Sequence, residues 1–236
     1  MNAVDPWGRK VFWLLLITGL LDRLALLLVF STRYIGMDDA VIWSAAVDYS
    51  MGEFHGPYFY GQDYAPMLEA LLAAPFVRAG ATLRIVVPAI TAALAMLPYW
   101  SFAFWNRRNG MHLAACAFLA MPVLLPNEYG LMTSVTRGWV TGTGLLALLP
   151  WTASFRSERL ASLSAGLVAS LACLMNPNAL PFAAAFIAWY LLNRHAFARH
   201  VVLVVTGASP GVLMHAVAQA WCNGHPERIV NSIRGW

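Results

Sequence analysis

Apolar residues dominate seven long runs of this chain, and short polar segments separate the runs from one another. A helix that crosses a membrane needs about 17–25 mostly apolar residues, and several of the runs are slightly shorter. The runs cover residues 11–30, 85–104, 111–125, 139–155, 160–175, 180–192 and 201–221. This pattern predicts an all-α, polytopic membrane helical bundle of about seven transmembrane helices, in which residues 1–236 form a single transmembrane domain.

The largest polar segment, residues 31–84, lies between the first two runs. It contains two helix-like pieces, at residues 39–50 and 66–77, and the second begins with Pro66, a favoured first-turn residue. The second piece is too short to cross a membrane and too apolar to lie in water. We therefore expect an outer-face loop with two short interfacial helices.

The composition excludes an ordinary soluble protein. Of 236 residues, 60% are hydrophobic and 11% are charged, whereas soluble domains carry about 25% charged residues. The three cysteines show no spacing of a zinc site or a disulfide framework. Arg9 and Lys10 precede the first run without a small-residue cleavage site, which favours an uncleaved signal anchor. The end of the chain carries no clear terminal signal, and we expect it to belong to a larger protein.

Charge is distributed in a way that predicts the orientation in the membrane. With a cytoplasmic N-terminus and seven spans, four basic clusters fall inside, as the positive-inside rule requires. The clusters are Arg9/Lys10, Arg107/Arg108, Arg156/Arg159 and Arg194/Arg199. Eight of the eleven acids then fall outside, whereas Arg33, Arg78, Arg84 and Arg137 run against the rule. The net charge of +4 reflects topology and lipid phosphates and does not indicate nucleic acid.

Asp38 and Asp39 follow the first run, at the point where a helix is expected to begin. Asp38 could be the N-cap and Asp39 a favourable first-turn charge. Alternatively, one carboxylate is a general base and the other binds a substrate hydroxyl or a metal ion, since neighbouring carboxylates raise one another's pKa. Oxygen ligands suit Mg, Mn or Ca. The spacing alone leaves both interpretations open.

Aromatic and hydrogen-bonding side chains are dense between residues 56 and 69. They include Tyr60, Gln62, Asp63, Tyr64 and Glu69. Tyrosines are enriched at membrane interfaces and could form an aromatic belt. The alternative is a cleft in which the rings stack on a sugar while the polar groups bind hydroxyls or a cation.

Several isolated polar residues allow further interpretations. Arg137, after the third run, could bind a lipid phosphate, while Arg33 and Arg84 are more typical of snorkelling to headgroups. Asp22 and Arg23 lie within the first run, where each would cost about 2.5–3.5 kcal/mol if unpaired. Adjacent residues do not face one another on a helix, so we expect each to find a partner on another helix. His215 and His225 are too isolated to propose as metal ligands, and residues 207–210 (Gly-Ala-Ser-Pro) predict a kink in the last run.

The order of these features resembles that of the GT-C glycosyltransferases, which include the protein O-mannosyltransferases and the bacterial aminoarabinose transferases of lipid A. Asp38-Asp39 lies where such enzymes carry Asp-Glu, and residues 60–76 are similar to a stretch in uncharacterised bacterial members. Asn176-Pro177 and residues 207–210 also look like those members. In place of the Pro-Pro-Leu motif of better-known members, this chain has Ala65-Pro66-Met67-Leu68.

The resemblance implies a module of seven helices in a bacterial inner membrane with its active face outward. It implies transfer of a sugar from a polyprenyl-phosphate carrier to an acceptor, with Asp38 as the general base and Asp39 as its companion. In this interpretation Tyr60, Gln62, Asp63, Tyr64, Glu69 and Arg137 bind substrates, and a divalent cation could join the acids. The expected partners are the lipid-linked sugar, membrane lipids and further membrane subunits.

Three functions follow from the sequence. A glycosyltransferase would invert the anomeric carbon in one displacement, and Arg137 would stabilise the leaving phosphate. A non-catalytic scaffold, a lipid-binding subunit or the N-terminal part of a larger transferase is the alternative. A transporter or flippase would place charges along helix interiors, where only Asp22 and Arg23 qualify.

Overall fold

The computed structural model describes residues 6–30, 36–125 and 138–230, and this part of the chain is all-α. The helices are α1 (Pro6–Phe30), α2 (Met37–Met51), α3 (Leu68–Arg78), α4 (Leu83–Arg108), α5 (His112–Leu124), α7 (Gly138–Leu146), α8 (Leu149–Ala153), α9 (Glu158–Met175), α10 (Leu180–Leu192) and α11 (Phe197–Gly224). Two 3-10 turns, η1 (Pro177–Ala179) and η2 (Pro226–Arg228), precede α10 and follow α11.

Among the described helices, four are long and apolar enough to cross a membrane. They are Gly8–Val29 within α1, Leu83–Arg108, Glu158–Met175 and Phe197–Gly224. The helices His112–Leu124, Gly144–Ala153 and Pro177–Leu192 are apolar but shorter. Each of the seven predicted runs is therefore helical, and four of them reach the length of a span.

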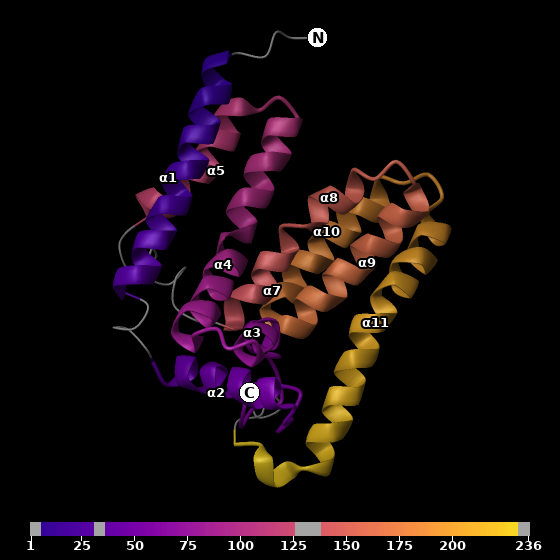
Figure 1. Cartoon of the computed structure of the whole chain (residues 1–236). Helices are drawn as coiled ribbons and strands as arrows, with labels where there is room; N and C mark the ends of the chain where they lie inside the picture. Colours follow the sequence, from indigo (N-terminus) through magenta and orange to yellow (C-terminus); the bar gives the residue numbers. More distant parts are fainter. Residues whose placement is uncertain (1–5, 31–35, 126–137, 231–236) are drawn as a thin grey trace.

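The helices are arranged as a bundle whose two ends differ in charge. Figure 1 shows α1, α4 and α5 in one half, α9, α10 and α11 in the other, and α2 and α3 across one end. We call that end the loop end. Successive long helices run in opposite directions, so the start of α1 and the turns after α4, α8 and α10 lie at the other end. Those turns carry the four basic clusters, and we call this the basic end.

The fourth predicted run, 139–155, is not one helix, because the chain breaks at Ala147 and Leu148 between α7 and α8. Pro150 has no N–H to donate to the carbonyl of residue 146, so an unbroken helix would lose a hydrogen bond here. Ser101 of α4 donates its hydroxyl to the Ala147 carbonyl at 2.6 Å, and the Trp151 indole donates to Ser101 Oγ at 2.8 Å. The carbonyl group of Ala147 at the break thus gains a hydrogen bond from a neighbouring helix.

The last predicted run forms one unbroken helix, α11, which continues through the expected kink at residues 207–210. Pro210 cannot donate to the Thr206 carbonyl, and the Ser209 hydroxyl donates to that oxygen instead, at 2.7 Å. A Cβ added to Gly207 would overlap the Leu163 carbonyl of α9, and one added to Gly166 would overlap the Val204 carbonyl. The glycines therefore serve close contact between α9 and α11, as small residues at this spacing do in membrane helices.

The expectation that Asp22 and Arg23 each find a partner on another helix is confirmed for Arg23 and wrong for Asp22. The Arg23 guanidinium folds back onto the Asp22 carboxylate, with Nε at 3.0 Å from Oδ2. Arg23 Nη2 also donates to the Pro122 carbonyl of α5 at 3.3 Å. That oxygen lies in the last turn of α5, where carbonyl groups lack a partner within the helix. The long, flexible arginine side chain allows a contact that the helix positions alone do not.

The two short helices at the loop end form as expected, with boundaries that differ by one or two residues from the predicted 39–50 and 66–77. Helix α3 begins at Leu68 and not at Pro66, because Ala65 has a positive φ of 57° and turns the chain there. Ile42, Ala45 and Ala46 of α2 pack against residues of α3 and against Val87 of α4. This apolar contact fixes the loop end to the bundle.

Candidate functional site

The two neighbouring acids, Asp38 and Asp39, differ in burial and in hydrogen bonding. Helix α2 has Gly36 as its N-cap residue, and the Gly36 N–H donates to Asp39 Oδ2 at 2.7 Å. The Asp39 side chain is buried, with 3% of the residue exposed, whereas Asp38 is exposed. The expectation that Asp38 is the cap is therefore wrong: Asp39, three residues after Gly36, satisfies the orphan donor. Within the described residues, no hydrogen bond or ion pair engages the Asp38 carboxylate.

Residues 52–67, which we call the strap, are fastened to the C-terminal part of the chain. The contacts are Tyr58 OH to His215 Nδ1 (2.8 Å), Gln219 Nε2 to the Asp63 carbonyl (2.7 Å), Arg228 Nη1 to the His55 carbonyl (3.1 Å) and Val230 N–H to the Gly61 carbonyl (2.8 Å). Gly56 lies against the Trp221 ring, and a Cβ there would be 3.1 Å from it. The strap thus links α2 and α3 to the end of α11.

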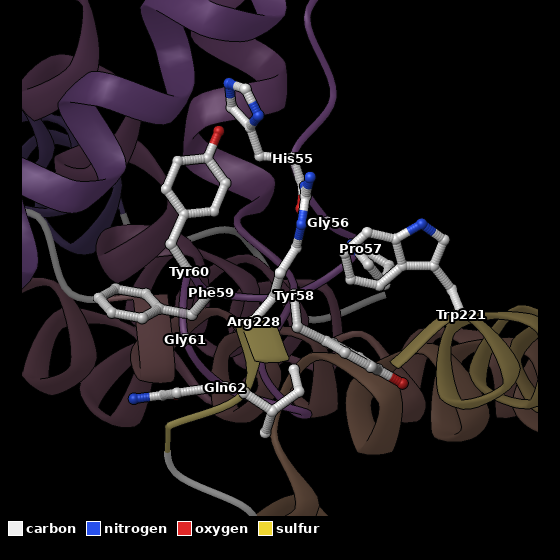
Figure 2. Close-up of a pocket in the computed structure, with 11 residues that line it drawn as sticks. His55, Gly56, Pro57, Tyr58, Phe59, Tyr60, Gly61, Gln62, Trp221 and Arg228 are labelled. Atoms are coloured by element: carbon white, nitrogen blue, oxygen red, sulfur yellow. The ribbon is translucent and has the colours of Figure 1, made fainter. Parts of the chain in front are cut away.

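A cavity of about 240 Å³, the strap pocket, lies between the strap and the end of α11 (Figure 2). His55, Tyr60, Gln62 and Arg228 supply its polar groups, and Trp221 forms one wall. The Tyr60 hydroxyl donates to Asp48 Oδ2 at 2.8 Å. Burial, together with the bond to Asp48 and its charge, raises the pKa of Tyr60. Tyr60 is therefore a neutral donor already committed to Asp48.

Asp48, Glu53 and His55 form a small cluster beside this pocket. Their potential ligand atoms lie within 4.8 Å of one another. His55 Nε2 is 3.8 Å from Asp48 Oδ2 and 3.6 Å from Glu53 Oε2. The three groups could approach a cation, but exposed acidic groups of this kind are common without one. They are not the acids, Asp38 and Asp39, that the sequence predicted for a metal.

A groove of about 550 Å³ runs along α9, α10 and α11, and we call it the α9–α11 groove. Its walls are apolar and mostly small, with Gly166, Ala169, Ala183, Ala184, Ala208 and Gly211 among them. Its polar residues are Asp63 and Tyr64 of the strap, Ser170, and His215. A second apolar cavity, of about 640 Å³, lies between the strap, α7, α9 and α11 and shares Leu174 with the groove.

Glu69 is fully buried at the start of α3. Its Oε1 accepts a hydrogen bond from Thr141 Oγ1 of α7 at 3.0 Å, and Oε2 has no partner among the described residues. Burial raises the pKa of this carboxyl group, and the hydrogen bonds from its own backbone and from Thr141 oppose the shift. A group in this position favours the protonated form.

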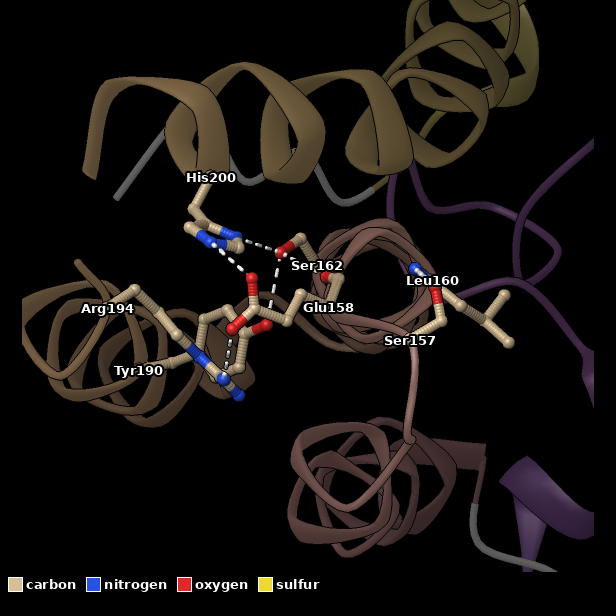
Figure 3. A network of polar contacts seen from close by, with 7 residues as sticks. All are labelled: Ser157, Glu158, Leu160, Ser162, Tyr190, Arg194 and His200. Atoms are coloured by element: carbon tan, nitrogen blue, oxygen red, sulfur yellow. Dashed lines mark hydrogen bonds and ion pairs between the residues drawn. The ribbon is translucent and has the colours of Figure 1, made fainter. Parts of the chain in front are cut away.

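The basic end contains a second polar cluster, which is shown in Figure 3. Ser162 Oγ lies 2.7 Å from His200 Nδ1 and 3.0 Å from Tyr190 OH, and His200 Nε2 lies 3.6 Å from Glu158 Oε2. Serine, histidine and an acid also form hydrolase triads. Here Ser162 and His200 are buried, and none of the three cavities described above reaches them. The cluster joins α9, α10 and α11, and the burial of Ser162 and His200 favours a structural role.

The structure spreads the predicted site residues over the loop end. Tyr60 and Gln62 line the strap pocket, and Asp63 and Tyr64 line the α9–α11 groove. Asp38, Asp39 and Glu69 line none of the three cavities, and Arg137 lies outside the described residues.

The sequence did not point to Asp48, His55 or Thr141, and His215 was considered there only as a metal ligand, although all four shape the loop end. The clearest signal was His215, a polar side chain inside an apolar run, which needs a partner. That partner is Tyr58, 157 positions earlier, too distant for any local pattern.

No protein-family model, curated protein or solved structure matches this chain. Its function has to be argued from its own residues and geometry.

Proposed function

We propose that this chain is a membrane glycosyltransferase of the GT-C type, which moves a sugar from a polyprenyl-phosphate carrier to an acceptor at the outer face of a bacterial inner membrane. The observation that carries the proposal is that the two acids at the start of α2 have different roles. Asp39 is buried and holds the helix cap, while Asp38 is exposed beside it and uncommitted within the described residues. A general base needs a free carboxylate held on a fixed backbone.

The arrangement of the helices supports seven crossings. Following the chain in Figure 1, α1, α4, α5, the α7–α8 pair, α9, α10 and α11 alternate in direction. With the basic end in the cytoplasm, as the positive-inside rule favours, α2, α3 and the strap lie outside. The free carboxylate is then on the face where a lipid-linked sugar would be used.

The reaction would proceed as a single displacement. Asp38 takes the proton of an acceptor hydroxyl, whose oxygen forms a bond to the anomeric carbon. The bond from that carbon to the phosphate oxygen breaks, and polyprenyl phosphate leaves with inversion. Arg137 keeps its predicted role of stabilising the leaving phosphate. Asp39 is buried and its Oδ2 accepts the Gly36 N–H, so Asp38 is the acid of the pair that is exposed to a divalent cation.

A lipid-binding subunit without catalysis is the second candidate, and the two large apolar cavities favour it. The transporter alternative has less support. The charged pair within α1, Asp22 and Arg23, is bonded to itself and to the Pro122 carbonyl.

The test is the substitution Asp38→Asn, measured by transfer of labelled sugar from a panel of polyprenyl-phosphate donors to membrane acceptors. Transfer should fall by about 10²–10⁴-fold, the usual share of general base catalysis, with the melting temperature unchanged because Asp38 holds no cap. Glu53→Gln, which neutralises another exposed acid at the loop end, is the matched control and should leave transfer unchanged. Full transfer by the Asp38→Asn protein would overturn the assignment, and absence of transfer by the wild type from every donor would favour the lipid-binding subunit.

A further inference from the structure

The strap pocket is lined by polar side chains that keep free hydrogen-bonding groups. The Gln62 amide and the Trp221 indole N–H have no hydrogen-bond partner among the described residues. Arg228 uses Nη1 for the His55 carbonyl, at 3.1 Å, which leaves its Nε and Nη2 without a described partner. Donors and acceptors that line a cavity in this way are accessible to a polar ligand.

Aromatic rings line the same cavity. Phe59, Tyr60 and Trp221 contribute them, from the strap and from the end of α11 (Figure 2). A sugar ring presents C–H groups on its faces and hydroxyl groups around its edge. Aromatic rings pack against the faces, and planar amide and guanidinium groups can bind two neighbouring hydroxyls. The strap pocket thus combines the two kinds of group that bind a sugar.

The charges around the pocket favour a neutral ligand. Arg228 lines the cavity, so its guanidinium disfavours a cation. Asp48 and Glu53 lie beside His55, with carboxylate oxygens 3.8 and 3.6 Å from its Nε2, and they disfavour an anion. A neutral ligand with several hydroxyls avoids both penalties and still uses the hydrogen-bonding groups.

The size and position of the pocket fit one unit of a water-soluble glycan. Its volume of about 240 Å³ is below the roughly 300–1,000 Å³ of sites for drug-sized ligands, so it holds about one sugar ring. A span that begins at residue 201 and covers about 20 residues ends near residue 220, before Trp221 and Arg228. Charged groups are costly in hydrocarbon, so the pocket lies in water or among headgroups.

Helix α2 separates the strap pocket from Asp38. Tyr60 of the pocket bonds to Asp48, which lies ten residues after Asp38, about 15 Å along the helix axis. Ten residues turn a helix by about 1000°, which leaves the two acids about 80° apart, on the same side of α2. A single sugar ring in the pocket cannot reach Asp38, whereas an oligosaccharide that lies along α2 can.

We infer that the strap pocket binds one sugar unit of a neutral oligosaccharide, away from the reacting hydroxyl, and that the sugar acceptor is such a glycan. The second part rests on the proposed function, since it takes Asp38 as the base. The first part does not, because the pocket binds sugar whether or not a sugar is transferred.

Binding can be measured without transfer. Saturation-transfer difference NMR on the purified full chain would use maltohexaose, 1,6-linked mannohexaose and chitohexaose, and the wild type should bind at least one of them. Gln62→Ala should weaken that binding about two- to tenfold, the loss expected for one neutral hydrogen bond, with an unchanged melting temperature. Asn193→Ala, which removes an exposed amide at the basic end, is the matched control and should bind like the wild type. Binding of none of the three, or equal binding by Gln62→Ala, would overturn the site.

The pocket and its charge preference have tests of their own. Ile229 lines the pocket, and the neighbouring Val230 is exposed and does not line it. Ile229→Trp should abolish binding by filling the cavity, and Val230→Trp should leave it unchanged. A galacturonic acid hexamer, which is anionic, and a glucosamine hexamer, which is cationic, should both bind more weakly than the neutral chain. Tighter binding of either charged chain would overturn the preference for a neutral ligand.

Acceptor length connects the pocket to transfer. With the bound hexasaccharide as acceptor, Gln62→Ala should raise KM by the factor lost in binding and leave kcat unchanged, because Gln62 contacts no reacting atom. With the corresponding monosaccharide, KM should not change, since one ring cannot occupy the pocket and reach Asp38. Equal changes for both acceptors would overturn the glycan assignment. A wild type that binds the hexasaccharide but transfers no sugar would overturn the proposed function and leave the binding site standing.

Discussion

Two histidines on α11 each contact a hydroxyl group through Nδ1, but they differ in burial and in the partner of Nε2. His200, at the basic end, is 1% exposed, and both ring nitrogens face protein groups, Nδ1 toward Ser162 and Nε2 toward Glu158. His215, toward the loop end, is exposed, with Nδ1 bonded to Tyr58 while Nε2 has no described partner. His200 is therefore a structural histidine, whereas His215 lines a cavity and has an Nε2 that can bind a ligand.

The same contrast applies to the two ends as a whole. At the basic end, serine, tyrosine, histidine and glutamate satisfy one another across α9, α10 and α11 (Figure 3). At the loop end, the strap brings comparable groups to the walls of a pocket and a groove. Polar groups that are mutually satisfied in the interior stabilise the fold, and those that line a cavity are accessible to a ligand.

The largest effect on stability is expected from breaking the closed cluster. Ser162→Ala removes the partner of both the Tyr190 hydroxyl and His200 Nδ1, and each unsatisfied buried group costs about 1–3 kcal/mol. We expect the free energy of unfolding to fall by about 2–4 kcal/mol in SDS titration followed by tryptophan fluorescence.

Ser164→Ala on the same helix is the matched control. Ser164 bonds only to the carbonyls of Leu160 and Ala161 in its own helix. Its loss should cost less than about 0.5 kcal/mol. If both alanine variants unfold alike, the basic end is not held by this cluster.

A smaller, pH-dependent effect is expected at Glu69, where the loop end has a buried acid in place of the exposed Glu158. Since burial raises the pKa of Glu69 above its ordinary value of 4.5, its contribution to stability is complete below about that pH. The contribution is lost as the pH rises through the raised value.

The melting temperature measured from pH 4.5 upward should therefore fall less in Glu69→Gln than in the wild type. Glu53→Gln alters an exposed acid and should follow the wild-type curve. A Glu69→Gln curve parallel to that of the wild type would mean that Glu69 is not titrating in this range.

The smallest effect concerns the acidic pair itself. Asp39→Ala removes the acceptor for the Gly36 N–H and should cost about 1 kcal/mol of stability, as loss of a helix cap does. Asp38→Ala should leave the same thermal melt unchanged within error. A reversed order would return the capping role to Asp38 and weaken its assignment as a base.

Much of the helical framework could be predicted, because the formation of each long helix depends on a local run of apolar residues. The break after Leu146 was missed, although Pro150 signals it, because the Ser101 hydroxyl that stabilises it comes from another helix. Residues 207–210 predicted a kink, and the sequence did not predict that Gly207 and Gly166 allow close contact between α11 and α9.

The candidate site was less predictable for the same reason. The sequence indicated Asp38 and Asp39 and left two interpretations open. The one that made Asp38 the cap is wrong, because Gly36 is the N-cap residue and its N–H donates to Asp39. Tyr60, Asp63 and Glu69 were predicted as one group, yet each faces a different partner: Asp48, the α9–α11 groove and Thr141. These three residues lie apart because of the way the strap folds over α11, which no local sequence pattern indicates.

The unbroken course of α11 has a mechanical consequence. Its 28 residues extend about 42 Å, about 12 Å more than a hydrocarbon core, so the helix exceeds a span by about eight residues. We call its last turns, which contact the strap, the post. Trp221 and Gln219 hold the strap on that post. One inserted residue would rotate the post by about 100° and turn its contacts away from the strap, while leaving the membrane-buried part of the helix in register. The position and rotation of the strap are thus set by a single long helix.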